Sequence, residues 1–307
     1  MIYTLTCNPA LDCSVRLGAL QEGAINFVDG CDLAPGGKGV NVSRVLTAMG
    51  ESNVALGFVA GGNGGMLESA LQKMGLMTAF THLDEGQTRI NVKLYGDTET
   101  ELNAPGPYVP VEALERLERQ LRSTVKPGDV MCLCGSLAPG LPVDTYGRLV
   151  RLLRQLGVTE TVVDTTGGAL LESLKERPWL INPNREELAA LVGRDLPAMS
   201  DVVDAAAELM EKGARNVLVS MGPDGAILCT ADGRWYQPAP DGKVVGTVGA
   251  GDSTVAGFMR GYIDSDDWVE ALRVGVACGS ATAFVPGLAG LKEIRAALKL
   301  LSDTQKI

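Results

Sequence analysis

From residue 111 onward, the chain alternates between amphipathic helical segments and short apolar runs. Residues 111–125 repeat apolar side chains with the period of a helix that buries one face. Residues 130–134, 161–164 and 179–181 are mostly apolar runs, which is typical of strands buried on both faces. This alternation predicts an α/β fold, with a mostly parallel sheet and helices on both of its faces. Ligands of such sheets bind at the carboxyl ends of the strands.

Within the first hundred residues, several strand-like runs do not fit this alternation. They are short and half-polar, and they occupy residues 14–17, 24–29, 77–82, 88–95 and 98–102. Such runs predict a small separate sheet that covers the site as a lid. We expect its strands to come from about 13–34 and 77–103, and the chain 1–307 to form a single domain that includes the lid.

The stretch Gly246–Gly257 is the strongest indication of chemistry. Gly249, Ala250 and Gly251 allow a ligand to approach the backbone closely, and a helical pattern follows them. The free N–H groups at a helix start attract an anion. Asp252 lies in the first turn, where it could take a proton from a hydroxyl, so the stretch predicts phosphoryl transfer to an alcohol. The alternative is that Asp252 only caps the helix.

The net charge and the cysteine content limit the kinds of partner and metal site that this chain can have. The net charge of −10 argues against nucleic acid, whose phosphates would be repelled. Seven cysteines without a Cys-x-x-Cys pair, and a single histidine, argue against a zinc site or a disulfide framework. Residues 274–291 are apolar but contain Gly, Ser, Thr and Pro, so they do not predict a membrane span. We therefore expect a cytoplasmic protein without nucleic-acid or membrane partners.

Six motifs together resemble the PfkB (ribokinase-like) family of sugar kinases. They occur in the family's order, from residue 8 to residue 253, and are 8–12 (NPALD), 36–42 (GGKGVNV), 88–93 (TRINVK), 135–137 (GSL), 182–188 (NPNREEL) and 248–253 (VGAGDS). Each motif is weak alone, but six in order are specific. The resemblance implies the ribokinase-like fold, with its β-sheet lid.

The resemblance also implies roles for particular residues. Asp252 would be the catalytic base, and Gly249, Ala250 and Gly251 together with Asp252 would form the anion hole. Sugar-binding roles fall on Asp12, Gly36, Gly37, Lys38, Asn41, Arg89 and Asn91. Lys38 and Arg89 would contact a substrate phosphate, and Lys93 shares a strand face with Arg89. The alternatives are a turn-forming Asp12, a solvated Lys38 and a solvated edge strand around Arg89.

The nucleotide and its metal would lie further along the chain. Residues implied for ATP are Asn184, Ser220, Gly222, Gly225 and Gly251. Glu187 would contact Mg²⁺ through water, as is usual for this ion. Asn184 and Glu187 also fit a capping box, and the two roles are compatible. The loop 220–225 could alternatively be a plain turn, and Asn182 stands where relatives commonly have lysine.

The function implied is ATP- and Mg²⁺-dependent phosphorylation of fructose 1-phosphate on its 6-hydroxyl. Tagatose 6-phosphate is the alternative substrate. A third hypothesis is a sugar-phosphate sensor without catalysis, which the intact Gly-Ala-Gly-Asp at 249–252 disfavours. Family analogy also implies a homodimer formed through the lid.

Overall fold

The computed structural model describes residues 1–307, apart from the side chain of Glu99. Its strands are β1 (Ile2–Thr6), β2 (Ala10–Arg16), β3 (Gly30–Gly36), β4 (Asn53–Ala60), β5 (Met77–Thr78), β6 (Thr81–Leu83), β7 (Arg89–Tyr95), β8 (Glu99–Leu102), β9 (Val130–Cys134), β10 (Glu160–Asp164), β11 (Leu180–Ile181), β12 (Val217–Ser220), β13 (Ala226–Cys229), β14 (Arg234–Gln237) and β15 (Gln305–Lys306). Its helices are α1 (Lys38–Ala48), α2 (Gly61–Lys73), α3 (Val111–Thr124), α4 (Thr145–Gln155), α5 (Gly167–Leu174), α6 (Arg185–Val192), α7 (Met199–Glu211), α8 (Ala250–Ser265), α9 (Trp268–Ala283) and α10 (Leu291–Leu300), with a 3₁₀ turn at Gly222–Asp224.

A large eleven-stranded sheet forms the centre of the molecule. Its order is β15-β14-β13-β12-β11-β10-β9-β1-β4-β5, with β6 also paired to β4. The pairs from β4 across to β12 are parallel, and those from β12 to β15 are antiparallel. Every residue of β1 and β9 is buried, as expected of central parallel strands. The predicted mostly parallel α/β architecture is therefore confirmed.

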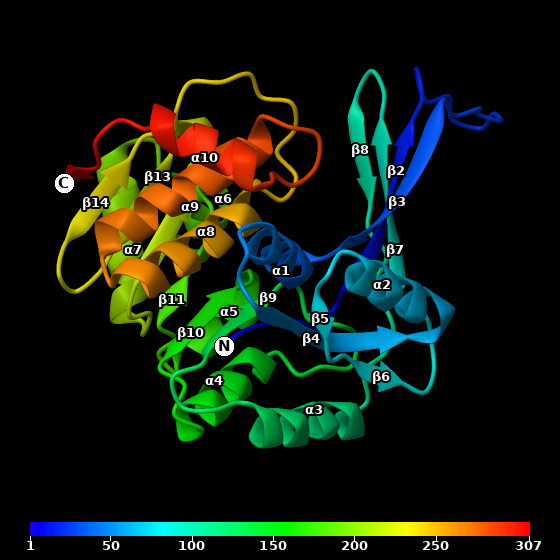
Figure 1. Ribbon diagram of the computed structural model, residues 1–307, viewed down its shortest axis with the longest axis horizontal. Coiled ribbons are helices and arrows are strands. Elements are labelled where there is room, and N and C mark those ends of the chain that lie inside the picture. The colour runs from blue at the N-terminus through cyan, green and yellow to red at the C-terminus, as the bar shows by residue number, and fades with distance from the viewer.

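Helices cover both faces of this sheet, as predicted (Figure 1). Helices α3 to α7 enclose one apolar core, while α1, α8, α9 and α10 enclose the other. Helix α2 packs beside α1 in a smaller apolar cluster with β4. Helix α8 approaches α9 closely, since a Cβ added at Gly257 would lie 2.6 Å from the Cys278 Sγ. None of the described helices has both the length and the apolar character needed to cross a bilayer.

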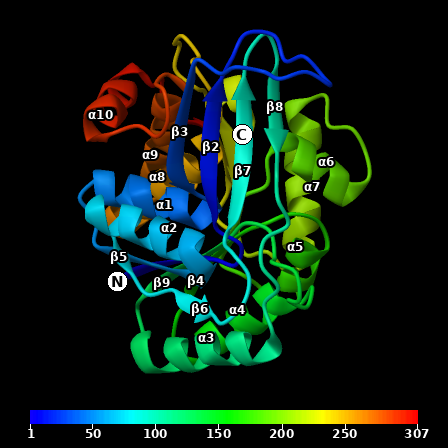
Figure 2. The ribbon, with the colours of Figure 1, turned by 90° about the vertical axis from the view of Figure 1, so that its right-hand side faces the viewer.

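The small sheet is separate and has the order β3-β2-β7-β8 (Figure 2). It rises beside the body as the predicted lid, and we call these four strands the lid. Its central strands β2 and β7 are parallel, and Asp12 lies opposite Asn91. Alternation along both strands places Asp12, Asn91 and Lys93 on one face of the lid.

Two expectations about the lid strands are wrong. Residues 24–29, expected as a strand, are irregular, and Ile25 and Phe27 are 85% and 90% exposed. Residues 77–83, expected in the lid, form β5 and β6 and pair in parallel with β4 of the large sheet. The reason is that α2 acts as a crossover helix, which returns the chain beside β4.

Candidate active site

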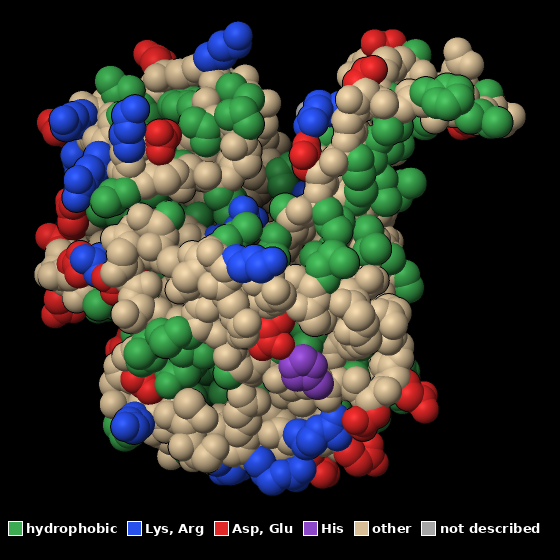
Figure 3. Space-filling model, turned by 45° about the vertical axis from the view of Figure 1, so that its right-hand side comes forward, with side chains coloured by type: hydrophobic (Ala, Val, Ile, Leu, Met, Phe, Trp, Pro, Cys, Tyr) green, Lys and Arg blue, Asp and Glu red, His purple; other side chains and the backbone are tan. Residues whose placement is uncertain are grey.

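A polar cavity of about 630 Å³ opens at the carboxyl ends of the central strands, between the body and the lid (Figure 3). Most predicted site residues line it: Asp12, Gly37, Lys38, Asn41, Arg89, Asn91, Asn184, Glu187, Ser220, Gly249, Gly251 and Asp252. The predicted residues therefore gather at the end of the sheet where ligands of such sheets are expected to bind. Gly36, Ala250, Gly222 and Gly225 do not line the cavity.

Asp252 lies at the third position of α8, and Gly249 is the residue before the helix, with φ 80°. The Asp252 side chain makes no capping hydrogen bond, so the capping alternative is wrong. Instead, Asn41 Nδ2 on α1 donates to Asp252 Oδ2 at 2.8 Å. Burial, followed by the charge of Asp164, raises the pKa of Asp252 to about 7, against the opposing effects of Asn41, Lys38 and Lys93. A carboxyl group with this pKa can act as a base near neutral pH.

The backbone before Asp252 forms a positively polarised turn. The Ala250 N–H donates to Thr247 O at 3.1 Å, and the Ser253 N–H donates to Gly249 O at 2.9 Å. The N–H groups of Gly251 and Asp252 lie between these two, in the first turn, where a helix leaves its donors free. Of the anion hole predicted at residues 249–252, the Ala250 N–H already has an acceptor, whereas the N–H groups of Gly251 and Asp252 are free donors.

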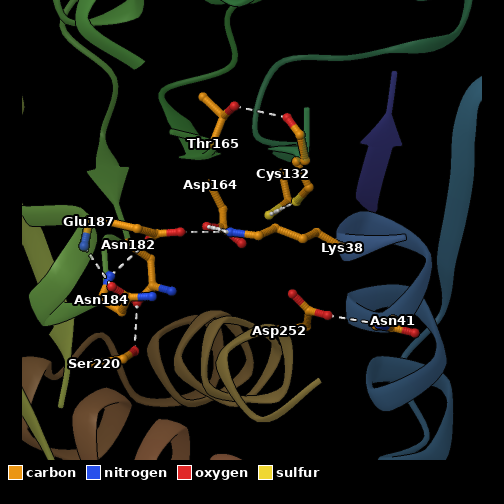
Figure 4. A network of polar contacts seen from close by, with 12 residues as sticks. Lys38, Asn41, Cys132, Asp164, Thr165, Asn182, Asn184, Glu187, Ser220 and Asp252 are labelled. Carbon is orange, nitrogen blue, oxygen red and sulfur yellow. Dashed lines mark hydrogen bonds and ion pairs between the residues drawn. The ribbon is translucent and has the colours of Figure 1, made fainter. Parts of the chain in front are cut away.

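Lys38 begins α1, and its side chain extends toward Asp164 and Glu187 (Figure 4). Its Nζ lies 3.0 Å from Asp164 Oδ1 and 3.8 Å from Glu187 Oε1. Burial alone would lower the pKa of Lys38, but the charges of these two carboxylates raise it. Lys38 is therefore a permanent cation held by two carboxylates, and the solvated-lysine alternative is wrong.

Glu187 caps the start of α6. Its Oε2 accepts from the Asn184 N–H at 2.9 Å, and Asn184 Oδ1 accepts from the Glu187 N–H at 2.7 Å, so the capping box is confirmed. Beside it, Ser220 Oγ donates to Asn182 Oδ1 at 3.3 Å. Asn182 offers the cavity an amide and no charge at this point.

The lid contributes a second group of polar side chains. Asn91 Nδ2 donates to Asp12 Oδ1 at 3.0 Å, and Lys93 Nζ lies 3.3 Å from Asp12 Oδ2. Lys93 also lies 3.9 Å from Glu101 Oε1. Arg89 is turned to backbone acceptors, and it donates to Asn8 O and Ala104 O. Burial lowers the pKa of Arg89, with the charge of Asp12 opposing.

Gly36 serves the site indirectly. A Cβ at this position would lie 2.3 Å from Asp12 Oδ2, so only glycine lets the Asp12 carboxylate take its place. Gly225 has φ 88°, and a Cβ there would lie 2.1 Å from Gln237 O. Both glycines, expected to touch ligands, instead allow two segments of chain to pack closely.

Some cavity residues were not predicted from the sequence. Asp164 is the clearest, because it ends β10 and binds Lys38, and an acidic residue at the carboxyl end of a parallel strand could have indicated it. Thr6, Asn8, Ser136 and Asn103 also line the cavity.

Three buried oxygens beside the cavity lack a hydrogen-bond partner among the described residues. They are Thr6 Oγ1, Asn8 Oδ1 and Asn91 Oδ1. Buried acceptors are almost always paired in proteins, by protein or by bound molecules.

Comparisons with known proteins agree with this geometry. Residues 11–294 match the family described as pfkB family carbohydrate kinase. A 1-phosphofructokinase of Bacillus subtilis is 40% identical over 284 residues, which cover 92% of this chain and 93% of that protein. A 1-phosphofructokinase of Escherichia coli is 35% identical over 278 residues, 90% of this chain and 88% of that protein.

A solved structure agrees in fold as well. The crystal structure of phosphofructokinase-2 from Escherichia coli, in complex with substrates and products, superposes with a TM-score of 0.92 at 29% identity. The match covers 98% of this chain and 99% of that one. The family match over most of the chain, these relatives and the shared fold lead to one conclusion: the chain belongs to the pfkB family of carbohydrate kinases.

Proposed function

We propose that the protein transfers the γ-phosphoryl group of ATP to the 6-hydroxyl of fructose 1-phosphate, giving fructose 1,6-bisphosphate. The observation that carries this proposal is the arrangement of charge in one cavity. Asp252 shares this cavity with the lid cations Arg89 and Lys93 and with the body cation Lys38. The charges of Lys38 and Lys93 both act on the Asp252 carboxyl group. Such an arrangement suits two anionic substrates that meet at a base. The names of the relatives, 1-phosphofructokinase, support the choice of sugar.

The lid side fits the sugar phosphate. Asp12 can accept hydrogen bonds from sugar hydroxyls, and Asn91 can donate or accept. Lys93, only 9% exposed, and Arg89 would bind the phosphate. Arg89 has only neutral carbonyl acceptors, so a phosphate would give it a charged partner, and hydrogen bonds between charged groups are the stronger ones. Binding would require Arg89 to exchange its backbone acceptors for phosphate oxygens.

The body side fits the triphosphate. Lys38 would bind its terminal phosphates, a role we now prefer to the sugar-phosphate contact expected from the sequence, because its partners are Asp164 and Glu187. Asn184 and Ser220 would supply polar contacts to the nucleotide. Within the described residues no cluster of three or more metal-ligating side chains occurs.

The carboxylates nevertheless fit Mg²⁺. This ion prefers oxygen ligands, keeps several waters, and is commonly held by one or two carboxylates together with substrate phosphates. Asp164 and Glu187 would hold it in this way, Glu187 through water. When bound, the ion would offset negative charge on the phosphates.

In the reaction, Asp252 would take the proton of the 6-hydroxyl as its oxygen attacks the γ-phosphorus. The bond from the γ-phosphorus to the bridging oxygen of ADP breaks. The Gly251 and Asp252 N–H groups would stabilise charge on the transferring group, where positioning and electrostatics do most of the work.

Kinetics on fructose 1-phosphate, tagatose 6-phosphate and fructose 6-phosphate, side by side, test the proposal. We expect fructose 1-phosphate to be preferred in kcat/KM by at least about tenfold, which is roughly 1.4 kcal/mol. Equal or better use of tagatose 6-phosphate would contradict it. No ADP release with any of the three would instead favour a sensor.

We also propose a cytoplasmic homodimer, in which a second copy packs on the tip of the lid. Ile25 and Phe27 are 85% and 90% exposed there, and their burial would be favourable. All seven cysteines are free thiols, which suits a reducing compartment. Light scattering on the wild type and on Phe27→Asp tests the dimer, and equal masses for both would contradict this contact.

A further inference from the structure

Cys13 on β2 and Cys31 on β3 are free thiols whose Sγ atoms lie 3.2 Å apart. In the single chain Cys31 is exposed and Cys13 is half-buried, so a reagent in solution can reach the pair in a protomer whose lid tip is not covered by a second copy. Cys13 lies opposite Leu33, and Val15 lies opposite Cys31, which makes the two cysteines diagonal neighbours on one face of the lid. We propose that Cys13 and Cys31 form a reversible intramolecular disulfide, which couples the lid to thiol oxidants.

The other cysteines show why this pair is distinct. Cys132 and Cys134 have Sγ atoms 3.1 Å apart, but both belong to the buried strand β9. Cys7, Cys229 and Cys278 are also buried. Buried thiols are inert toward reagents in solution. Among the described cysteines, proximity and access therefore coincide at Cys13 and Cys31.

The oxidant would be a low-molecular-weight disulfide. Cys31, the more exposed thiol, attacks one of its sulfurs as the thiolate and releases one small thiolate, which leaves a mixed disulfide on Cys31. Cys13 then loses its proton to solvent and attacks the Cys31 Sγ, which releases the second small thiolate. The two protein thiols lose two electrons in total, and the small disulfide is reduced to two thiols.

The position of the pair links this bond to the site. Diagonal neighbours of an antiparallel pair have Cα atoms roughly 7–8 Å apart, whereas a disulfide usually holds them at about 4.4–6.8 Å. Closing the bond must therefore draw β2 and β3 together or change their twist. Asp12 directly precedes Cys13, and β3 continues through Gly36, which packs on the Asp12 carboxylate. The disulfide should thus alter the sugar side of the cavity more than the nucleotide side.

Native protein treated with oxidised glutathione, followed by peptide mapping without reduction, tests the bond. We expect a peptide that joins Cys13 to Cys31, the loss of two hydrogen masses from the intact chain, and recovery of both thiols with dithiothreitol. Cys13→Ser should accumulate the glutathione adduct on Cys31, because no second thiol displaces it. Cys132 and Cys134 are the internal control, and they should remain thiols under the same conditions.

The kinetic test rests on the proposed function, whereas the mass measurement does not. Oxidised wild type should show a changed KM for fructose 1-phosphate, with a smaller change in KM for ATP, and reduction should restore both. Cys31→Ser should have the kinetics of the reduced wild type and should not respond to the oxidant. A joined peptide with unchanged sugar KM would refute the coupling.

The bond itself would be refuted by equally persistent glutathione adducts on wild type and Cys13→Ser. It would also be refuted by oxidised chains linked covalently to one another, as seen by electrophoresis without reductant. If fully reduced protein showed no preference for fructose 1-phosphate, the proposed function would be refuted, but the proposal of the disulfide would be unaffected.

Discussion

Replacing Asp252 by asparagine should abolish most activity and stabilise the protein, the latter in a pH-dependent way. The asparagine side chain cannot take a proton, and removing a general base costs roughly 10²–10⁴ in rate. The stability effect follows from the raised pKa of the buried carboxyl group, about 7 in the folded protein against an ordinary 3.8. Between these values the folded protein binds a proton that the unfolded chain releases. Wild-type stability therefore falls as pH rises from about 4 to about 7, and then levels off.

The size of the effect follows from 1.36 kcal/mol per pKa unit. Compared with a side chain that does not titrate, Asp252 therefore lowers the free energy of unfolding by about 2 kcal/mol at pH 5 and by about 4 kcal/mol at pH 8. Asparagine never carries this cost, and it keeps an oxygen that can accept from Asn41. The advantage of Asp252→Asn over wild type should therefore grow by roughly 2–3 kcal/mol between pH 5 and pH 8.

Urea unfolding of the ligand-free protein at both pH values measures this difference. Asp303→Asn is the matched control, because Asp303 is an exposed carboxylate far along the chain, and its effect should be small at both pH values. If Asp252→Asn gave the same change in unfolding free energy at pH 5 and pH 8, the carboxyl group would titrate alike in the folded and unfolded chain. Burial would then not govern the protonation of Asp252.

Three further predictions concern the reaction. First, kcat/KM for fructose 1-phosphate should rise about tenfold per pH unit below pH 7 and flatten above it, since the base must be ionised in the free enzyme; a flat profile from pH 5.5 to 9 would contradict this. Second, Glu187→Gln can keep the capping box, so the melting temperature should barely move while the Mg²⁺ concentration needed for half-maximal rate rises; an unchanged Mg²⁺ titration would leave Glu187 with a structural role only. Third, Lys93→Met should raise KM for fructose 1-phosphate by roughly 10–100-fold, which corresponds to the loss of one charge-assisted hydrogen bond. Lys38→Met should instead raise mainly the KM for ATP. The reverse pattern would mean that Lys38 binds the sugar phosphate and Lys93 binds ATP.

Much of the fold could be predicted because its signals are local. The apolar period of α3 and the continuous apolar run of β9 are readable without knowing any contact. The strands at 77–83 could not be assigned correctly, because a short apolar run fits either sheet. These residues pair with β4 because α2 returns the chain to the side of that strand, and nothing in the short run itself indicates this.

In the site, too, features set by local sequence could be predicted, and contacts between distant residues could not. Local spacing predicted Asp252 at a helix start and Lys38 beside glycines, and both lie in the cavity. The contact between Lys38 and Asp164 spans 126 residues, so no local pattern could reveal which phosphate Lys38 faces. The Gly36 prediction failed in a similar way, because its close neighbour is a side chain of the adjacent strand.

Three aspartates of the cavity differ in their partners, and this difference separates their roles. Asp164 lies 3.0 Å from the ammonium group of Lys38, and Asp12 lies 3.3 Å from that of Lys93. Each of these carboxylates is balanced by a cation, which suits a group that holds a ligand or positions a lysine. Asp252 has only the neutral amide of Asn41 in contact, and burial with the nearby charge of Asp164 raises its pKa. A carboxyl group whose pKa is raised toward neutral by its surroundings is suited to exchange a proton. The pairing of side chains thus supports the proposal that Asp252 is the base, independently of the sequence motif that contains it.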